Sequence, residues 1–169
     1  MKKKITADKI AYALEGFLDN DYKMFINHLK DLTKEKIVID KQKSKEIMAL
    51  FMFAICQATI RTLGDTSITK YIMSKFQADI FNHAFEDSKE RESFKNLFWE
   101  RVNEYSEVFY AENKSLDVQI GQIFCRHFWG KDDIKQAPMM MAVGYFFLTT
   151  MLETSNFLKE ILTSYEIIL

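Results

Sequence analysis

Two long stretches of this chain carry no charged side chain, and they limit what the chain can fold into. The first, Ile47–Ile60, has the sequence IMALFMFAICQATI, and the second, Gln136–Leu152, has the sequence QAPMMMAVGYFFLTTML. A helix with one face in water shows a single apolar stripe, whereas these two stretches are apolar nearly all round. We therefore expect two helices that are covered on every side, in a core, at a subunit interface or around a ligand cavity.

Residues that signal turns are scarce in this sequence, which has five Gly and one Pro among 169 residues. A many-stranded sandwich or barrel needs frequent turns, so this composition favours long helices. Apolar residues at helical spacing recur along the chain between capping residues such as Thr6 and Asp87. We predict an all-α fold for residues 1–169, a single-domain helical bundle of six to seven helices with one or two fully buried or interface helices.

Capping residues give the expected boundaries of several helices. A helix over about 43–63 ends at Gly64, because glycine is the usual residue just after a helix. Asp65 or Thr66 then caps the next helix, and the sequence from Asp87 to Glu90 resembles a capping box that opens another. Asn113 is the expected end of that helix.

The C-terminal part of the chain predicts two more helices. Ser115 is placed to cap the first of them, which ends at Gly130. The last helix begins at Pro138, a favourable first residue, and continues to about Tyr165. Between these two helices, residues 131–137 form a hinge.

Two segments in the first half of the chain leave alternatives open. Residues 7–32 form one helix or two, because Asp19, Asn20 and Asp21 compete for backbone hydrogen bonds and indicate a stop and restart. In the following segment, residues 37–39 (Ile-Val-Ile) are a packed loop or one short strand. The lysines from Lys34 to Lys45 alternate with acidic residues, as is typical of a solvated connector.

The overall charge and the cysteines bear on partners and location. A formal net charge of −1 and scattered arginines give no reason to expect nucleic acid as a partner. Cys56 and Cys125 each lie in an apolar segment, which is typical of reduced core thiols in a cytoplasmic protein. Gln136–Leu152 is at the short limit for a membrane span and contains Pro138 and Gly144, so no membrane span is expected.

No motif in the sequence fixes a catalytic reaction, so an enzyme is not the favoured interpretation. Asp79, His83 and Glu86 or Asp87 share one helical face and could hold a metal ion, but one helix supplies too few ligands for a closed site. The acidic line Glu100, Glu104 and Glu107 is interpreted as a solvated helix face.

His127 is the one histidine on an apolar helix face, between Phe124 and Phe128. Such a residue could hold haem or a metal ion in a sensor or enzyme, which is one alternative function. A core or rim histidine with an ordinary hydrogen-bond partner is the commoner case. The cofactor is therefore left unknown.

The favoured function is a non-enzymatic binding or regulatory protein that forms a homodimer. Its two charge-free helices are rich in Met and Phe, which adaptable cavities and interfaces use, so a small lipid-like or aromatic ligand is also expected. A second alternative is an adaptor or inhibitor whose protein partner covers one of these helices. The residues predicted to line the pocket or interface are Phe51, Met52, Ile55, Phe124, His127, Phe128, Met140, Val143, Tyr145, Phe147 and Met151.

Overall fold

Six helices and two short strands make up the described part of the chain, which in this computed structural model comprises residues 2–34, 36–111, 115–130 and 137–169. The predicted all-α fold with six helices is confirmed. In chain order the elements are β1 (Lys3–Thr6), α1 (Ala7–Leu32), α2 (Lys41–Leu63), α3 (Ser67–His83), α4 (Ser88–Phe109), α5 (Leu116–Trp129), α6 (Ala137–Ser164) and β2 (Tyr165–Ile168).

Most helix boundaries fall within two residues of their predicted positions, because they are set by local capping interactions. The Thr66 hydroxyl accepts a hydrogen bond from the backbone N–H of Thr69, and the Asp87 carboxylate accepts two from the first turn of α4. Gly64 ends α2 with φ of 75°, a conformation that favours glycine. Ser115 precedes α5, but its side chain makes no capping hydrogen bond. The predicted stop at Asn113 is four residues too late, because α4 ends at Phe109, and most of the predicted hinge lies outside the described residues.

Helix α2 forms the centre of the fold and contacts all five other helices. Within the described residues it is the one helix long and apolar enough to cross a membrane, and 72% of its apolar window is buried inside the fold. A covered core helix passes the same test of length and composition, so this property alone indicates burial. The expectation that the first charge-free stretch is covered on every side is confirmed.

Helix α1 runs without a break from Ala7 to Leu32, so of the two alternatives for residues 7–32 the structure has one helix, with no stop at residues 19–21. Asp21 is buried, and its Oδ2 accepts a hydrogen bond of 2.7 Å from the Thr150 hydroxyl in α6. The Asp21 carboxylate thus accepts a hydrogen bond from α6 and does not compete for the backbone N–H groups of α1. Helix α1 therefore continues past this residue.

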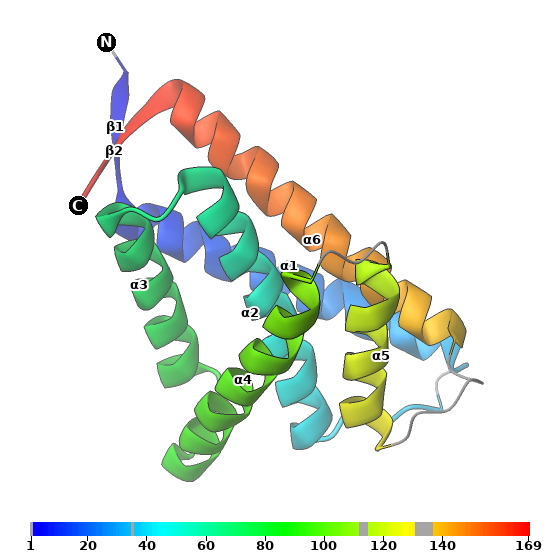
Figure 1. Cartoon of the computed structure of the whole chain (residues 1–169). Helices are drawn as coiled ribbons and strands as arrows, with labels where there is room; N and C mark the ends of the chain where they lie inside the picture. Colours follow the sequence, from blue (N-terminus) through cyan, green and yellow to red (C-terminus); the bar gives the residue numbers. More distant parts are fainter. Residues whose placement is uncertain (1, 35, 112–114, 131–136) are drawn as a thin grey trace.

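The two ends of the described chain are joined by a parallel pair of strands, which the sequence did not predict. Lys3 pairs with Tyr165 and Thr6 with Ile168, so both termini lie at the same end of α6 (Figure 1). The last helix therefore ends at Ser164, close to its predicted end, and the chain continues as β2. Residues 37–39 form no strand. Ile37 and Ile39 pack partly buried against the core, as a packed loop.

Helices α5 and α6 approach each other closely at two glycines. A Cβ atom on Gly121 of α5 would overlap the backbone carbonyl of Met140, and one on Gly144 of α6 would overlap that of Asp117. The two contacts are reciprocal, because each helix contributes one glycine and also the backbone carbonyl that faces the glycine of the other helix. Since any larger residue would push the helices apart, these positions require glycine.

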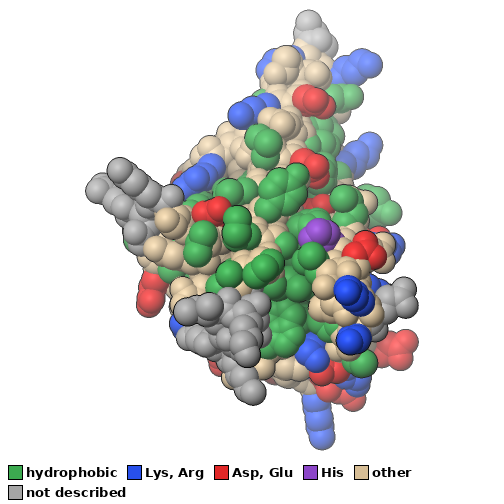
Figure 2. Space-filling model, turned by 90° about the vertical axis from the view of Figure 1, so that its right-hand side faces the viewer, with side chains coloured by type: hydrophobic (Ala, Val, Ile, Leu, Met, Phe, Trp, Pro, Cys, Tyr) green, Lys and Arg blue, Asp and Glu red, His purple; other side chains and the backbone are tan. Residues whose placement is uncertain are grey.

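Helix α6 is covered on one side only by the rest of this chain, in contrast to the sequence expectation. Val143, Phe147 and Leu158 point into the core, whereas the opposite side exposes four large apolar side chains. Figure 2 shows hydrophobic side chains gathered along the corresponding side of the molecule. The exposed side chains are those of Met141, Tyr145, Leu148 and Leu152, and we call them the α6 stripe.

Replacing Asp21 by asparagine is expected to stabilise the protein at neutral pH. Burial raises the pKa of Asp21, although the Thr150 hydroxyl partly offsets this effect. A raised acid pKa means that the folded state takes up a proton more readily than the unfolded state, so ionised Asp21 costs stability above that pKa. Asparagine is neutral at every pH and can still accept the Thr150 hydrogen bond.

Urea denaturation of both proteins between pH 4 and pH 8 checks this prediction. The stability advantage of Asp21→Asn should be largest at high pH and should shrink as the pH falls through the raised pKa of Asp21. A variant less stable than the wild type at pH 7 would contradict it.

Candidate functional site

Eight of the eleven predicted site residues lie in the hydrophobic core. Aromatic rings from three helices meet there, with Phe25 of α1 making edge contacts to Phe51 and Phe124 at centroid distances of 5.5 and 5.7 Å. These rings pack against one another, and the cavity described below is lined by none of the predicted site residues. The eight core residues are Phe51, Met52, Ile55, Phe124, Phe128, Val143, Phe147 and Met151.

The other three predicted residues lie at or near the surface. Met140 is half-buried and Tyr145 is exposed in the α6 stripe. His127 is half-buried, and its Nε2 lies 2.7 Å from Glu104 Oε2 of α4. This ring nitrogen is therefore engaged by a carboxylate, and the expectation that the whole acidic line of α4 is solvated is wrong for Glu104.

Glu104 belongs to a larger buried polar cluster between α2, α4 and α5. The Arg101 guanidinium donates two hydrogen bonds of 2.8 Å to the two carboxylate oxygens of Glu46, and a third of 2.9 Å to Glu104. Lys45 similarly reaches Glu90 at 2.6 Å. The two buried charged residues of α2, Lys45 and Glu46, are thus paired with opposite charges of α4, which explains how the start of this helix can lie in the core.

Tyr105, next to this cluster, has a buried hydroxyl without a hydrogen-bond partner in the described structure. Burial, and to a lesser extent the charge of Glu46, raise the pKa of Tyr105 well above its ordinary value. The cluster is closed off from solvent except at its Glu104–His127 end, so a stabilising role accounts for it.

The described residues contain no group of three or more His, Cys, Asp or Glu placed to hold a metal ion. The candidate metal ligands from the sequence, Asp79 and His83 with Glu86 or Asp87, therefore do not form such a group. Asp79 instead pairs with Lys75 of its own helix. Of the two thiols, Cys56 is fully buried, and burial raises its pKa to about 11, so it stays protonated and unreactive.

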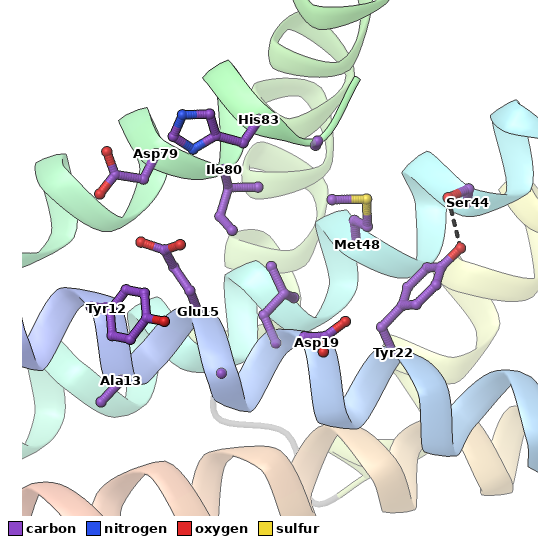
Figure 3. Close-up of a pocket in the computed structure, with 13 residues that line it drawn as sticks. Tyr12, Ala13, Glu15, Asp19, Tyr22, Ser44, Met48, Asp79, Ile80 and His83 are labelled. Carbon is purple, nitrogen blue, oxygen red and sulfur yellow. Dashed lines mark hydrogen bonds between the residues drawn. The ribbon is translucent and has the colours of Figure 1, made fainter. Parts of the chain in front are cut away.

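A cavity of about 590 Å³ opens between α1, α2 and α3, within the size range of small-molecule sites. Figure 3 shows Glu15, Asp79 and His83 at one end of this cavity and Met48, Tyr22 and Ser44 at the other. We call it the α1–α3 pocket. It is lined by Tyr12, Ala13, Glu15, Gly16, Leu18, Asp19, Tyr22, Ser44, Met48, Asp79, Ile80, His83 and Ala84.

The middle of the α1–α3 pocket is apolar, and its far end is fixed by a hydrogen bond. Leu18 of α1, Met48 of α2 and Ile80 of α3 supply the apolar wall. Beyond them, the Tyr22 hydroxyl and the Ser44 hydroxyl lie 2.8 Å apart, which ties α1 to the start of α2. The wall therefore offers an apolar ligand contacts from three helices.

Carboxyl groups dominate the charge of this pocket, because its lining includes three of them and no lysine or arginine. Asp19 and Asp79 are each paired with a lysine on their own helix, Lys23 and Lys75. Glu15 takes part in none of the ion pairs among the described residues. Partial burial raises the pKa of Glu15, and the neighbouring Asp79 raises it further by repulsion and by a side-chain hydrogen bond, while Lys75 and His83 partly offset the rise.

Sequence reasoning missed this pocket because its polar residues resemble ordinary wet helix faces. Glu15 and Asp19 lie one turn apart on α1, and Gly16 between them leaves open space, since an added Cβ would meet no atom within 4 Å. A mid-helix glycine is the one local signal, because glycine there costs stability and calls for a reason.

Comparison with known proteins adds no assignment, since no protein-family model, no curated protein and no solved structure matches the chain. The pocket and the exposed surface are therefore the features that bear on function.

Proposed function

We propose that the protein is a non-enzymatic binding protein that takes a small amphiphilic amine in the α1–α3 pocket. The observation that carries this proposal is Glu15, a partly buried carboxyl group at the end of an apolar cavity, which forms no salt bridge among the described residues although Lys75 and His83 lie near enough to act on its charge. A protonated amine would add a positive charge beside the three carboxyl groups of the pocket, and its hydrocarbon part would cover the wall formed by Leu18, Met48 and Ile80.

The size and charge of the pocket support this ligand class over others. A cavity of about 590 Å³ accommodates a ligand larger than a simple ion. A fatty acid would place its carboxylate near Glu15 or Asp79 and be repelled, whereas an uncharged alcohol would gain no attraction from the carboxyl groups. Octylamine, octanol and octanoate share one chain length and differ in the head group, so they test the charge preference directly.

Filling the pocket from Gly16 is expected to abolish binding. Because Gly16 lines the pocket and has open space around it, Gly16→Leu adds a side chain there without disturbing the core. Gly16→Ala is the matched control, since a single added carbon leaves most of the cavity free. Thermal unfolding in the presence of octylamine is the measurement.

At ten times its dissociation constant, a ligand stabilises the folded state by about 1.4 kcal/mol, which raises Tm by roughly 3–6 °C for a chain of this size. Wild type and Gly16→Ala should show this rise with octylamine, whereas Gly16→Leu should not. Octanoate should give no rise with any of the three proteins. An equal response of all three to octylamine would contradict the proposed site.

The pH dependence of binding follows from the raised pKa of Glu15. Protonated Glu15 is neutral and cannot pair with an amine, so affinity should increase as the pH rises through a value above the ordinary 4.5. Glu15→Gln should remove this dependence and weaken octylamine binding at pH 7. The affinity for octanol should be the same in wild type and in Glu15→Gln.

A further inference from the structure

We propose that the α6 stripe is the contact surface of a two-fold symmetric homodimer, in which two copies of α6 pack antiparallel. This inference is independent of the proposed ligand and rests on a different face of the molecule. The stripe belongs to the charge-free Gln136–Leu152 stretch, and its side chains lie where a solvent-facing helix ordinarily carries charged residues. Figure 2 shows the band of hydrophobic side chains on this side.

The spacing of the stripe suits a second copy of this chain. Its four members follow one another at intervals of four, three and four residues, which is the same order in either direction. When two such helices pack antiparallel about a two-fold axis, Met141 faces Leu152 of the other copy, and Tyr145 faces Leu148. Every member of the stripe thus meets an apolar partner, as a self-complementary interface requires.

The area of the stripe is sufficient for a dimer at the small end of stable interfaces. Met141, Tyr145, Leu148 and Leu152 are 64, 66, 42 and 60% exposed. Together they present about 400 Å² of apolar side chain per copy, or about 800 Å² in a dimer. Because interfaces are roughly 60% apolar, the total buried area is about 1,300 Å², just inside the standard range.

Charge does not oppose this contact. No charged residue occurs between Gln136 and Leu152, so two copies of the stripe meet without repulsion. Beyond Leu152 the same helix face becomes polar, with Asn156 and Lys159 both exposed. The continuous apolar stripe therefore ends where the antiparallel pairing ends, and the next exposed large apolar residue of α6, Leu162, lies ten positions further along.

Sedimentation velocity of the full chain between about 1 and about 200 µM tests the dimer, because an interface of this size gives roughly micromolar affinity. Wild type should convert from monomer to dimer over this range. Leu148→Glu brings two carboxylates together near the axis and should raise the dissociation constant more than tenfold. Val38→Glu changes an exposed apolar residue outside the stripe and should leave the dissociation constant unchanged.

Single cysteines on the stripe test the antiparallel geometry. In that arrangement Leu148 lies about 4.5 Å along the helix axis from its own copy, whereas Leu152 lies about 16 Å from its own. Leu148→Cys should therefore form a disulfide-linked dimer under mild oxidation, and Leu152→Cys should not. The native thiols Cys56 and Cys125 are buried and contribute little background.

Three results would overturn the proposal. A wild-type protein that stays monomeric over the whole concentration range excludes a second copy as the occupant of the stripe. Equal dissociation constants for wild type and Leu148→Glu place the dimer contact elsewhere. Self-linking of Leu152→Cys as readily as Leu148→Cys indicates parallel helices.

Discussion

Arg101→Met is expected to destabilise the protein by about 3–5 kcal/mol, because it leaves the buried carboxylate of Glu46 without its counter-charge. Glu46 is fully buried in α2, and Arg101 binds both of its oxygens at 2.8 Å. The Gln42 amide also donates to Glu46, at 3.1 Å, but a neutral amide cannot replace a guanidinium. Loss of Arg101 also removes one of the two hydrogen-bond partners of Glu104, the other being His127.

The double variant Glu46→Gln with Arg101→Met separates the uncompensated charge from lost packing. If the buried charge causes the loss, the double variant should be more stable than Arg101→Met alone, by roughly half of that loss or more. Urea denaturation with a common baseline gives all three free energies of unfolding. A loss below about 1 kcal/mol in Arg101→Met would show that the pair is not closed off from water as described.

Gly144→Ala is expected to destabilise the fold by about 3 kcal/mol or more, because its Cβ would overlap the carbonyl group of Asp117 in α5. The overlapping atoms are backbone, so they cannot turn aside as the end of a flexible side chain could. The two helices must separate, and that separation loosens the core contacts of Val143 and Phe147. Gly121→Ala should have a similar effect through Met140.

Gly16→Ala is the matched control for this second prediction. It makes the same change in the middle of a helix, but no atom lies within 4 Å of the added Cβ. Alanine should therefore stabilise α1 by about 0.5–1 kcal/mol through the lower entropy of the unfolded chain. A Gly144→Ala protein as stable as the wild type would contradict the close approach of α5 and α6.

Local signals in the sequence predicted the helices and their boundaries well. Thr66, Asp87 and Gly64 act through atoms within a few residues of themselves, so their roles can be inferred without knowing the fold. The burial of α2 also followed from its composition, because a stretch apolar on all sides has no face to offer water.

Long-range contacts explain what the sequence did not reveal. The sequence around Asp21 left one helix or two open, and its hydrogen bond to Thr150, 129 residues away, accounts for its place inside the single helix α1. Strands β1 and β2 pair the two ends of the chain, and each is too short to show a pattern by itself. Lys45 likewise belonged to the segment predicted to be solvated, but it is buried and pairs with Glu90 of α4.

The candidate site was beyond sequence reasoning for a related reason. The predicted pocket residues are the most apolar of the chain, and the fold places most of them in contact with one another in the core. A cavity forms where packing is incomplete, and here that occurs between half-polar helix faces. Glu15 and Met48 belong to different helices, and they line the same cavity only because the fold brings those helices together.

The most direct test of the proposed binding site is an NMR titration of the protein with octylamine, using ¹³C-labelled methionine methyl groups. Met48 lines the α1–α3 pocket, Met52 lies in the core, and Met24 and Met141 are exposed on other surfaces. We expect the methyl signal of Met48 to shift and saturate, while those of Met24 and Met141 do not move. Saturable shifts at Met24 or Met141 with an unchanged Met48 would contradict the proposed site.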